Sequence, residues 1–362
     1  MKKCCLALLI AFALFALTLD AREEYLKGKV VRIEKPLLPD ESESGEIREI
    51  WPMRVLILEG ERRNEEVPVE FPLYRENAYN VSIREGDPVV IFYDTEEETE
   101  HYYIVDTDKR IYLYAMAGIF ICLALLFSKA RGLRGLLALL FVIAFIYGWF
   151  VPFIIKGNSP IAGAVLTAVF ASVVTIYLMT GFNAKGLVAI MGAVGGVIAA
   201  GALSLIFVYK MRLTGFVTTE TLNYAGMLQN VNLREIISAG VIIGSMGAVM
   251  DVGMSISSAL NELREKKSDI TSGEIFRSGM NIGSDMIGTM INTLILAYVG
   301  SSLLTNILVA LQKDQFPMIR LLNFENIVVD FLRAMCGSIG ILVAVPITAW
   351  VASRFYGKHG KS

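Results

Sequence analysis

Apolar runs of membrane-spanning length constrain the fold of this chain more than any other feature. A helix needs about 20 mostly apolar residues to cross the hydrocarbon core of a bilayer. From Ile111 onward, runs of about this length alternate with short polar breaks. The runs cover residues 111–128, 135–155, 160–180, 186–208, 237–259, 285–311 and 330–353. Only 19% of the residues are charged, below the roughly 25% typical of soluble domains. We therefore predict an α-helical polytopic membrane protein with about seven transmembrane helices.

The first 21 residues have the features of a secretory signal. Lys2 and Lys3 precede an apolar run that extends to Leu19, which matches the charged and apolar regions of such signals. Leu19 fits poorly three residues before a cleavage after Ala21, so the segment is either a signal peptide or an uncleaved anchor. The four cysteines lie in this leader or in predicted spans, so we expect no disulfide framework.

Residues 22–108 are predicted to form a small extracytoplasmic β domain, and residues 109–362 the helical bundle. Short segments rich in Val, Ile, Tyr and Phe predict strands at 27–34, 53–59, 66–74, 88–94 and 101–106. Five short strands in this length favour a small barrel, OB-like or similar. The β domain holds 23 acidic and 11 basic residues, so its surface is acidic. Two interpretations are open, a cap that binds a ligand or partner and a folded domain with a solvated acidic face.

Orientation follows from the leader and from the basic residues of the loops. A leader that exports the β domain makes the first span run inward. The loops that then face the cytoplasm carry more Lys and Arg than the outer loops, as the positive-inside rule requires. Both signals place the C-terminus in the cytoplasm.

Polar and small residues form stripes along the last three predicted spans. Residues three or four apart share one face of a helix. On the 237–259 span this face holds Gly240, Gly244, Gly247, Asp251, Ser255, Ser258 and Glu262. On the next span it holds Asn281, Asp285, Gly288 and Asn292, flanked by Ser284 and Thr289. The last span aligns Asp330, Arg333, Gly337, Gly340 and Ala344.

The two carboxylates in these stripes point to a functional site. A charged group at bilayer depth costs about 2.5–3.5 kcal/mol on insertion scales, and such groups usually mark a pathway or a site. We predict an ion- or substrate-binding site formed by Asp251, Asp285, Asn281, Asn292, Ser255, Ser258 and Thr289. The glycines are predicted to allow close helix packing: Gly240, Gly244, Gly247, Gly288, Gly337 and Gly340. With residues 263–284 as an inner connection, Asp285 should lie near the inner end of its span and face the same cavity as Asp251.

Three segments carry a resemblance to a known family. They read GSMGAVMDVGMSISSALNEL at 244–263, SGMNIGSDMIGTMINTLILAY at 278–298 and GSIGILVAVPIT at 337–348. In these motifs the chain resembles the YibE/F-like family of bacterial multi-pass membrane proteins, and the leader, outer β domain and helix bundle match the family layout. The resemblance implies a location in the bacterial plasma membrane. It implies an architecture more than a mechanism, and it brings no established catalytic residues.

Three functions compete. The favoured one is a membrane transporter or permease coupled to a cation or proton, because carboxylate, amide and hydroxyl oxygens suit such ligands. The alternative is a non-catalytic receptor or scaffold that uses the outer β domain. A di-aspartyl intramembrane protease is less favoured, because residues 282–285 read IGSD where those enzymes have GxGD.

Soluble enzyme and nucleic-acid signatures are absent from the sequence. No HExxH or P-loop motif occurs, and the two histidines are too few and too far apart for a zinc site. We therefore expect no enzymatic activity, no cofactor and no nucleic-acid partner. The expected partners are the lipid bilayer and a small ion or solute, and the sequence leaves both the identity of a bound metal ion and homo-oligomerisation open.

Overall fold

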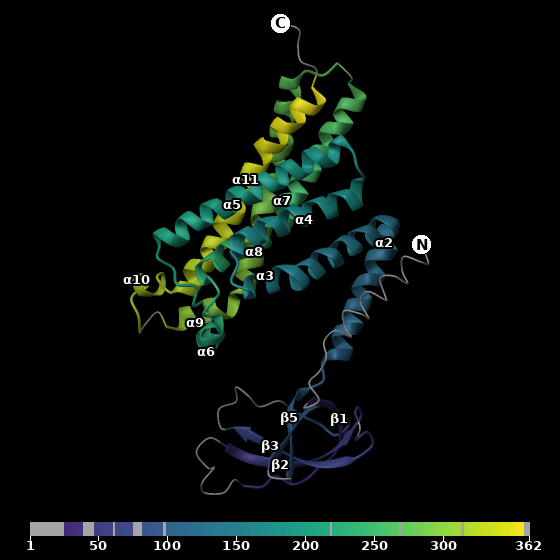
Figure 1. Cartoon of the computed structure of the whole chain (residues 1–362), viewed down its shortest axis with the longest axis vertical. Helices are drawn as coiled ribbons and strands as arrows, with labels where there is room; N and C mark the ends of the chain where they lie inside the picture. Colours follow the sequence, from purple (N-terminus) through teal and green to yellow (C-terminus); the bar gives the residue numbers. More distant parts are fainter. Residues whose placement is uncertain are drawn as a thin grey trace. The chain divides into compact units, whose positions relative to one another are not determined.

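A computed structural model describes residues 25–38, 47–60, 62–74, 82–96, 99–217, 219–267, 269–312 and 315–357. The predicted leader, residues 1–21, lies outside the described residues. The chain divides into two compact units between Leu126 and Phe127. Figure 1 labels the strands and helices of both. The first unit contains a β-sheet and the start of the first long helix, and the second is entirely helical.

Five antiparallel strands form the sheet of the first unit. They are β1 (Tyr25–Ile33), β2 (Ile47–Ile57), β3 (Glu66–Tyr74), β4 (Pro88–Glu96) and β5 (Thr99–Thr107). All five predicted strands are present. The strands are hydrogen-bonded in the order β3-β2-β1-β4-β5. The two edge strands, β3 and β5, also lie close to each other, but no ladder of hydrogen bonds joins them. The sheet is thus an antiparallel half-barrel, and the finer OB-like assignment stays a prediction.

The core of the half-barrel comes from one side of each strand. Val30, Val55, Val89 and Ile91 are at most 1% exposed, because alternate residues of a strand point to the same face. The edge strand β3 carries Pro68 and Pro72. Proline has no N–H to offer a further strand, so it protects an edge from pairing with other chains.

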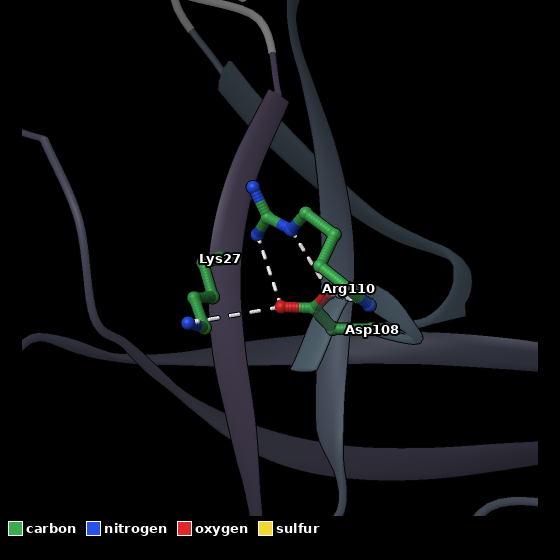
Figure 2. A network of polar contacts seen from close by, with 3 residues as sticks. All are labelled: Lys27, Asp108 and Arg110. Atoms are coloured by element: carbon green, nitrogen blue, oxygen red, sulfur yellow. Dashed lines mark hydrogen bonds and ion pairs between the residues drawn. The ribbon is translucent and has the colours of Figure 1, made fainter. Parts of the chain in front are cut away.

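A buried carboxylate joins the sheet to the first long helix (Figure 2). Asp108 is 4% exposed and lies directly after β5. Its carboxylate accepts hydrogen bonds from the backbone N–H of Arg110 at 3.0 Å and from the guanidinium Nε and Nη2 at 2.9 and 3.0 Å. Lys27 Nζ of β1 lies 3.7 Å from Oδ2. The guanidinium of Arg110 holds the pKa of Asp108 below its ordinary value. These contacts attach the first turn of the helix to β1.

Among the described residues, six helices are long and apolar enough to cross a membrane. They are Arg110–Ile155, α4 (Pro160–Thr180), α5 (Ala184–Lys210), α7 (Leu233–Lys266), α8 (Ser272–Ser301) and α11 (Glu325–Tyr356). The first comprises α2 (Arg110–Phe145), the π-helical η2 (Ile146–Phe150) and α3 (Val151–Ile155). Its backbone breaks at Lys129, with φ 47° and ψ −125°, between two predicted spans. Seven crossings therefore stay a prediction.

Shorter helices connect the long ones. α6 (Thr219–Asn223) and η3 (Ala225–Leu228) lie between α5 and α7, and α9 (Leu303–Leu311) and α10 (Met318–Leu321) lie between α8 and α11. α9 lies inside the predicted 285–311 span, which the structure divides at Ser302.

The helical unit is built around α5, α7 and α11, which pack against one another, while α4 packs on α5 and α7 and α8 lies along α11 (Figure 1). Small residues allow the closest approach. A Cβ added to Gly196 of α5 would lie 2.6 Å from the carbonyl oxygen of Gly340 and 2.7 Å from the Cβ of Ala344, both in α11. The backbones of α5 and α11 are therefore in direct contact.

α8 begins 13 residues earlier than the predicted span at 285. Thr271 caps it: the Thr271 hydroxyl accepts the Glu274 N–H, and the Glu274 carboxylate accepts the Thr271 N–H at 2.8 Å. This capping box provides partners for N–H groups that the helix leaves unpaired. Because α7 continues to Lys266, the predicted connection over 263–284 is wrong, and five residues separate the two helices.

Candidate intramembrane carboxylate site

Asp251 and Asp285 both lie near the middle of their helices. At 1.5 Å per residue, Asp251 is ~27 Å from the start of α7 and ~22 Å from its end. Asp285 is ~20 Å from the start of α8 and ~24 Å from its end. The hydrocarbon core of a bilayer is about 30 Å thick, so both acids belong to the central part of helices that can cross it. α8 begins at Ser272, so Asp285 is not at the start of its helix. Its predicted place near the inner end of the membrane span stays a prediction.

Contacts with α11 fix the relative depth of α7 and α8. A Cβ on Gly337 of α11 would lie 3.2 Å from the Cβ of Ser245 in α7 and 3.0 Å from Cδ2 of Leu294 in α8. Ser245 and Leu294 are therefore at the same level. Further along the same pair of helices, a Cβ on Gly279 would lie 3.1 Å from Cδ1 of Leu260. Both contacts give one antiparallel register.

In this register the two acids are at nearly the same depth. Asp251 is level with Gly288, and Asp285 is level with Met254 and one residue from Ser255. Asp285 and Gly288 are three residues apart, which is about 4.5 Å along a helix. The two acids therefore lie at nearly the same depth on neighbouring helices, with hydroxyl-bearing side chains close in depth to both carboxylates.

Most residues of the two polar stripes are exposed in the described part of the chain. The opposite side of α7 is packed, since Val249, Val252, Ile256 and Leu260 are 0% exposed. The exposed members of the stripes on α7 and α8 are Gly244, Gly247, Asp251, Ser255, Glu262, Asn281, Ser284, Asp285, Gly288, Thr289 and Asn292. Gly240 and Ser258 are half-buried. In a bilayer, such a face needs contact with water or with other polar groups.

Neither carboxylate has a hydrogen bond or an ion pair within the described part of the chain. The Thr289 hydroxyl donates to the Met286 carbonyl of its own helix at 2.9 Å. No group of three or more His, Cys, Asp or Glu side chains among the described residues could hold a metal ion. A cation on this face would therefore rely on amide, hydroxyl and backbone oxygens beside the two carboxylates.

The glycines predicted to pack fall into two groups. Gly337 and Gly340 lie against neighbouring helices. A Cβ added to Gly240 would contact the Arg333 guanidinium, and a Cβ added to Gly244 would clash with the Tyr298 hydroxyl. By contrast, Gly247 and Gly288 have no atom within 4 Å of where their Cβ would be. These last two glycines leave space on the polar face.

A polar cluster that the sequence reasoning did not assemble lies between α7, α8 and α11. Asp330 accepts hydrogen bonds from Ser302 Oγ at 2.5 Å and from Arg333 Nη1 at 3.3 Å. The nearby Tyr298 hydroxyl is buried without a hydrogen-bond partner among the described residues. The spacing of Asp330 and Arg333 is a signal for the ion pair, whereas no local pattern identifies Tyr298 or Ser302.

The comparisons with known proteins agree with this architecture. The family of YibE/F-like proteins matches residues 116–358, about two thirds of the 362 residues. The matched part contains the α7–α8 hairpin and both acids, and it excludes the β-sheet. No curated protein and no solved structure matches the chain. With its long apolar helices, this is a membrane protein, and the chain belongs to the YibE/F-like family.

Proposed function

We propose that this protein is a membrane transporter or permease coupled to a cation or a proton, with its binding site at Asp251 and Asp285. One observation carries the proposal: two carboxylates lie at nearly one depth on adjacent helices, both exposed and both without hydrogen-bond or ion-pair partners among the described residues. The proposal assigns no covalent step and no cofactor.

The free-energy cost of placing two charged acids inside a membrane favours a site that water or an ion can reach. Each charge near the bilayer centre costs about 2.5–3.5 kcal/mol on insertion scales. Hard cations bind carboxylate, amide and hydroxyl oxygens, which Ser255, Asn281 and Thr289 offer within one or two turns of the acids. A proton could instead bind to either carboxylate.

The proposal includes an orientation. The leader and the distribution of Lys and Arg support an extracytoplasmic β domain, a cytoplasmic C-terminus and a bacterial plasma-membrane location. The α7–α8 connector then faces the cytoplasm.

Flux measurements on the full chain test the proposal. Purified protein is placed in liposomes, and inward gradients of H⁺, Na⁺, K⁺ and Mg²⁺ are applied in turn. We expect uptake of one of these ions that Asp251→Asn abolishes and Asp285→Asn strongly reduces. Asp269→Asn, which changes an exposed acid in the connector, is the matched control and should transport normally. Unchanged flux in Asp251→Asn would disprove the proposal.

The two alternatives predict different results. Cleavage of a model transmembrane substrate that is lost in Asp285→Ala would indicate a di-aspartyl protease. A receptor role has one observation in its favour, a groove of about 330 Å³ on the half-barrel. Its lining includes Glu34, Arg54 and Glu70. Specific capture of a partner by the full chain, lost in Arg54→Glu while ion flux is unchanged, would support that role.

A further inference from the structure

We propose that Arg333 of α11 and Tyr298 of α8, together with the bare backbone of α7 at Gly240, form a binding site for the carboxylate group of a small solute. The site lies within the helical unit, ~17 Å along α7 from Asp251. It does not rest on the proposed function, because a carboxylate can bind here whether or not the protein transports an ion.

The polar cluster at this place has donors without acceptors. Both oxygens of Asp330 already have partners: Oδ2 accepts a hydrogen bond from the Ser302 hydroxyl at 2.5 Å, and Oδ1 accepts one from Nη1 of Arg333 at 3.3 Å. In the described part of the chain, the groups that still lack a partner are Nε and Nη2 of Arg333 and the hydroxyl of Tyr298. All three carry a hydrogen to donate, so the missing partner is an acceptor.

The free edge of Arg333 has the geometry that binds a carboxylate. The N–H groups of Nε and Nη2 are parallel, so each can donate to one oxygen of the same planar group. Arg110 forms this pairing elsewhere in the chain, where its Nε and Nη2 donate to the two oxygens of Asp108 at 2.9 and 3.0 Å. At Arg333 no described residue supplies the corresponding carboxylate.

Gly240 leaves space beside this edge. A Cβ added to Gly240 would lie 3.7 Å from Nε and 3.8 Å from Nη2 of Arg333, and no side chain of another helix except Arg333 comes within 4 Å of that point. The Arg333 side chain is also 32% exposed. The oxygen atoms of a ligand can therefore approach the edge, because α7 has no side chain in the way.

The Tyr298 hydroxyl lies about one turn of α7 from this edge. It faces Gly244, where an added Cβ would clash with it, and residues four apart on a helix have Cβ atoms about 5–6 Å apart. The hydroxyl oxygen is buried without a hydrogen-bond partner among the described residues, which is unfavourable in a membrane. A solute whose carboxylate pairs with Arg333 brings an acceptor within reach of this hydroxyl.

The cluster lies near one end of the bundle. α7 and α11 run in the same direction, because Gly240 contacts Arg333 and Ser245 contacts Gly337 further along both helices. Gly240 is ~11 Å from the start of α7, and Arg333 is ~12 Å from the start of α11. A small solute can therefore reach the site from one membrane surface without crossing the bilayer.

The charges of the cluster favour a carboxylate over a phosphate. Arg333 supplies one positive charge, and Asp330 beside it supplies one negative charge. A carboxylate brings a single negative charge, whereas a phosphate monoester carries about −1.5 to −2 at neutral pH. Repulsion from Asp330 opposes the larger charge more strongly, so the site selects a monoanion.

The melting temperature of the purified full chain tests the site. It is measured with rising sodium acetate against sodium chloride at the same ionic strength. A ligand that binds the folded state raises the melting temperature, so we expect acetate to raise it more than chloride does. An equal effect of the two salts would overturn the proposal. A rise with inorganic phosphate or with added phosphatidylglycerol but not with acetate would also overturn it, since the ligand would then be a phosphate group.

Three variants locate the effect of acetate. Tyr298→Phe removes only the hydroxyl and should weaken acetate binding about tenfold, the effect of losing one hydrogen bond to a charged group. Arg333→Lys keeps the charge but removes the paired N–H groups, and it should abolish the acetate effect. Arg320→Lys, at an arginine that stacks on Phe316, is the matched control and should bind acetate as the wild type does. Equal binding by all three variants would overturn the proposal.

Gly240→Asp provides a test within the chain itself. Its carboxylate would supply from α7 the acceptor that Arg333 lacks. We expect Gly240→Asp to melt at a higher temperature than Gly240→Asn and to show no response to acetate. A wild-type acetate response in Gly240→Asp would contradict the site. None of these measurements involves ion flux, so the outcome for Asp251→Asn in liposomes decides the transport proposal separately.

Discussion

Gly196 and Gly340 face each other across the contact between α5 and α11, so closely that a Cβ on Gly340 would lie 3.0 Å from the Gly196 carbonyl oxygen. A larger side chain must push the two helices apart, and overpacking usually costs about 1–3 kcal/mol. We therefore expect Gly340→Val to lower the melting temperature of the purified protein. Gly135→Ala, at a helical glycine with open space around it, should not lower it. Equal melting temperatures for Gly340→Val and the wild type would contradict the tight crossing.

Gly244 and Tyr298 should be energetically coupled. A Cβ on Gly244 would clash with the Tyr298 hydroxyl and would lie 3.5 Å from the ring atom Cζ. We expect Gly244→Ala to be destabilising by about 1–3 kcal/mol and to cost clearly less when combined with Tyr298→Phe. A double-mutant cycle of unfolding free energies measures this coupling. Additive effects would show that the two groups do not touch.

The ion network at Asp108 should make the stability of the β-sheet depend on pH. Because Arg110 lowers the folded-state pKa of Asp108, the carboxylate contributes stability above its unfolded pKa of about 3.9. This contribution is lost as the pH falls through the lower folded-state pKa. At pH 7, Asp108→Asn should lower the stability of the sheet by about 1–3 kcal/mol.

Trp51 of β2 reports this unfolding when the other two tryptophans, Trp149 and Trp350, are replaced by phenylalanine. The difference between Asp108→Asn and the parent should shrink below pH 4. Asp94→Asn, at an exposed carboxylate of β4, serves as the control. A difference that is constant from pH 7 to pH 3 would argue against an ionised Asp108.

Glu325 should hold the loop that follows α5. Its carboxylate accepts hydrogen bonds from the backbone N–H groups of Thr214 at 2.7 Å and Gly215 at 2.6 Å, and from the Thr214 hydroxyl at 2.8 Å. Glu325→Ala should therefore speed tryptic cleavage after Lys210 and Arg212 in the purified protein. Glu265→Ala, at an exposed acid, should cleave at the wild-type rate, and equal rates for both variants would exclude the clamp.

Local patterns in the sequence predict much of this fold. The strands follow from short runs of Val, Ile and Tyr, because alternation with a period of two is set by the strand itself. The long helices follow from hydropathy, because each must bury its backbone polar groups in the hydrocarbon region. The β3–β5 approach could not be predicted in this way, since it joins residues far apart in the chain.

The start of α8 shows where hydropathy misleads. Residues 272–284 are polar enough to resemble a loop, yet the Thr271–Glu274 capping box begins the helix there. The sequence contains this signal, and reading it would place Asp285 at mid-helix. The stripes themselves were predictable from spacing. Which side of the hairpin they occupy was not, because a stripe does not reveal what the rest of the chain packs against.

The five-residue connector between α7 and α8 limits how many residues can separate Asp251 from Asp285. With so little slack, the number of residues between Asp251 and Asp285 determines both the depth and the direction of the second acid. One residue inserted within α7 after Asp251 would rotate everything beyond it by about 100° and advance it by about 1.5 Å. Two insertions of one residue, one in each helix, would not restore the original alignment of the stripes. The site thus depends on a fixed count of residues as well as on their chemistry.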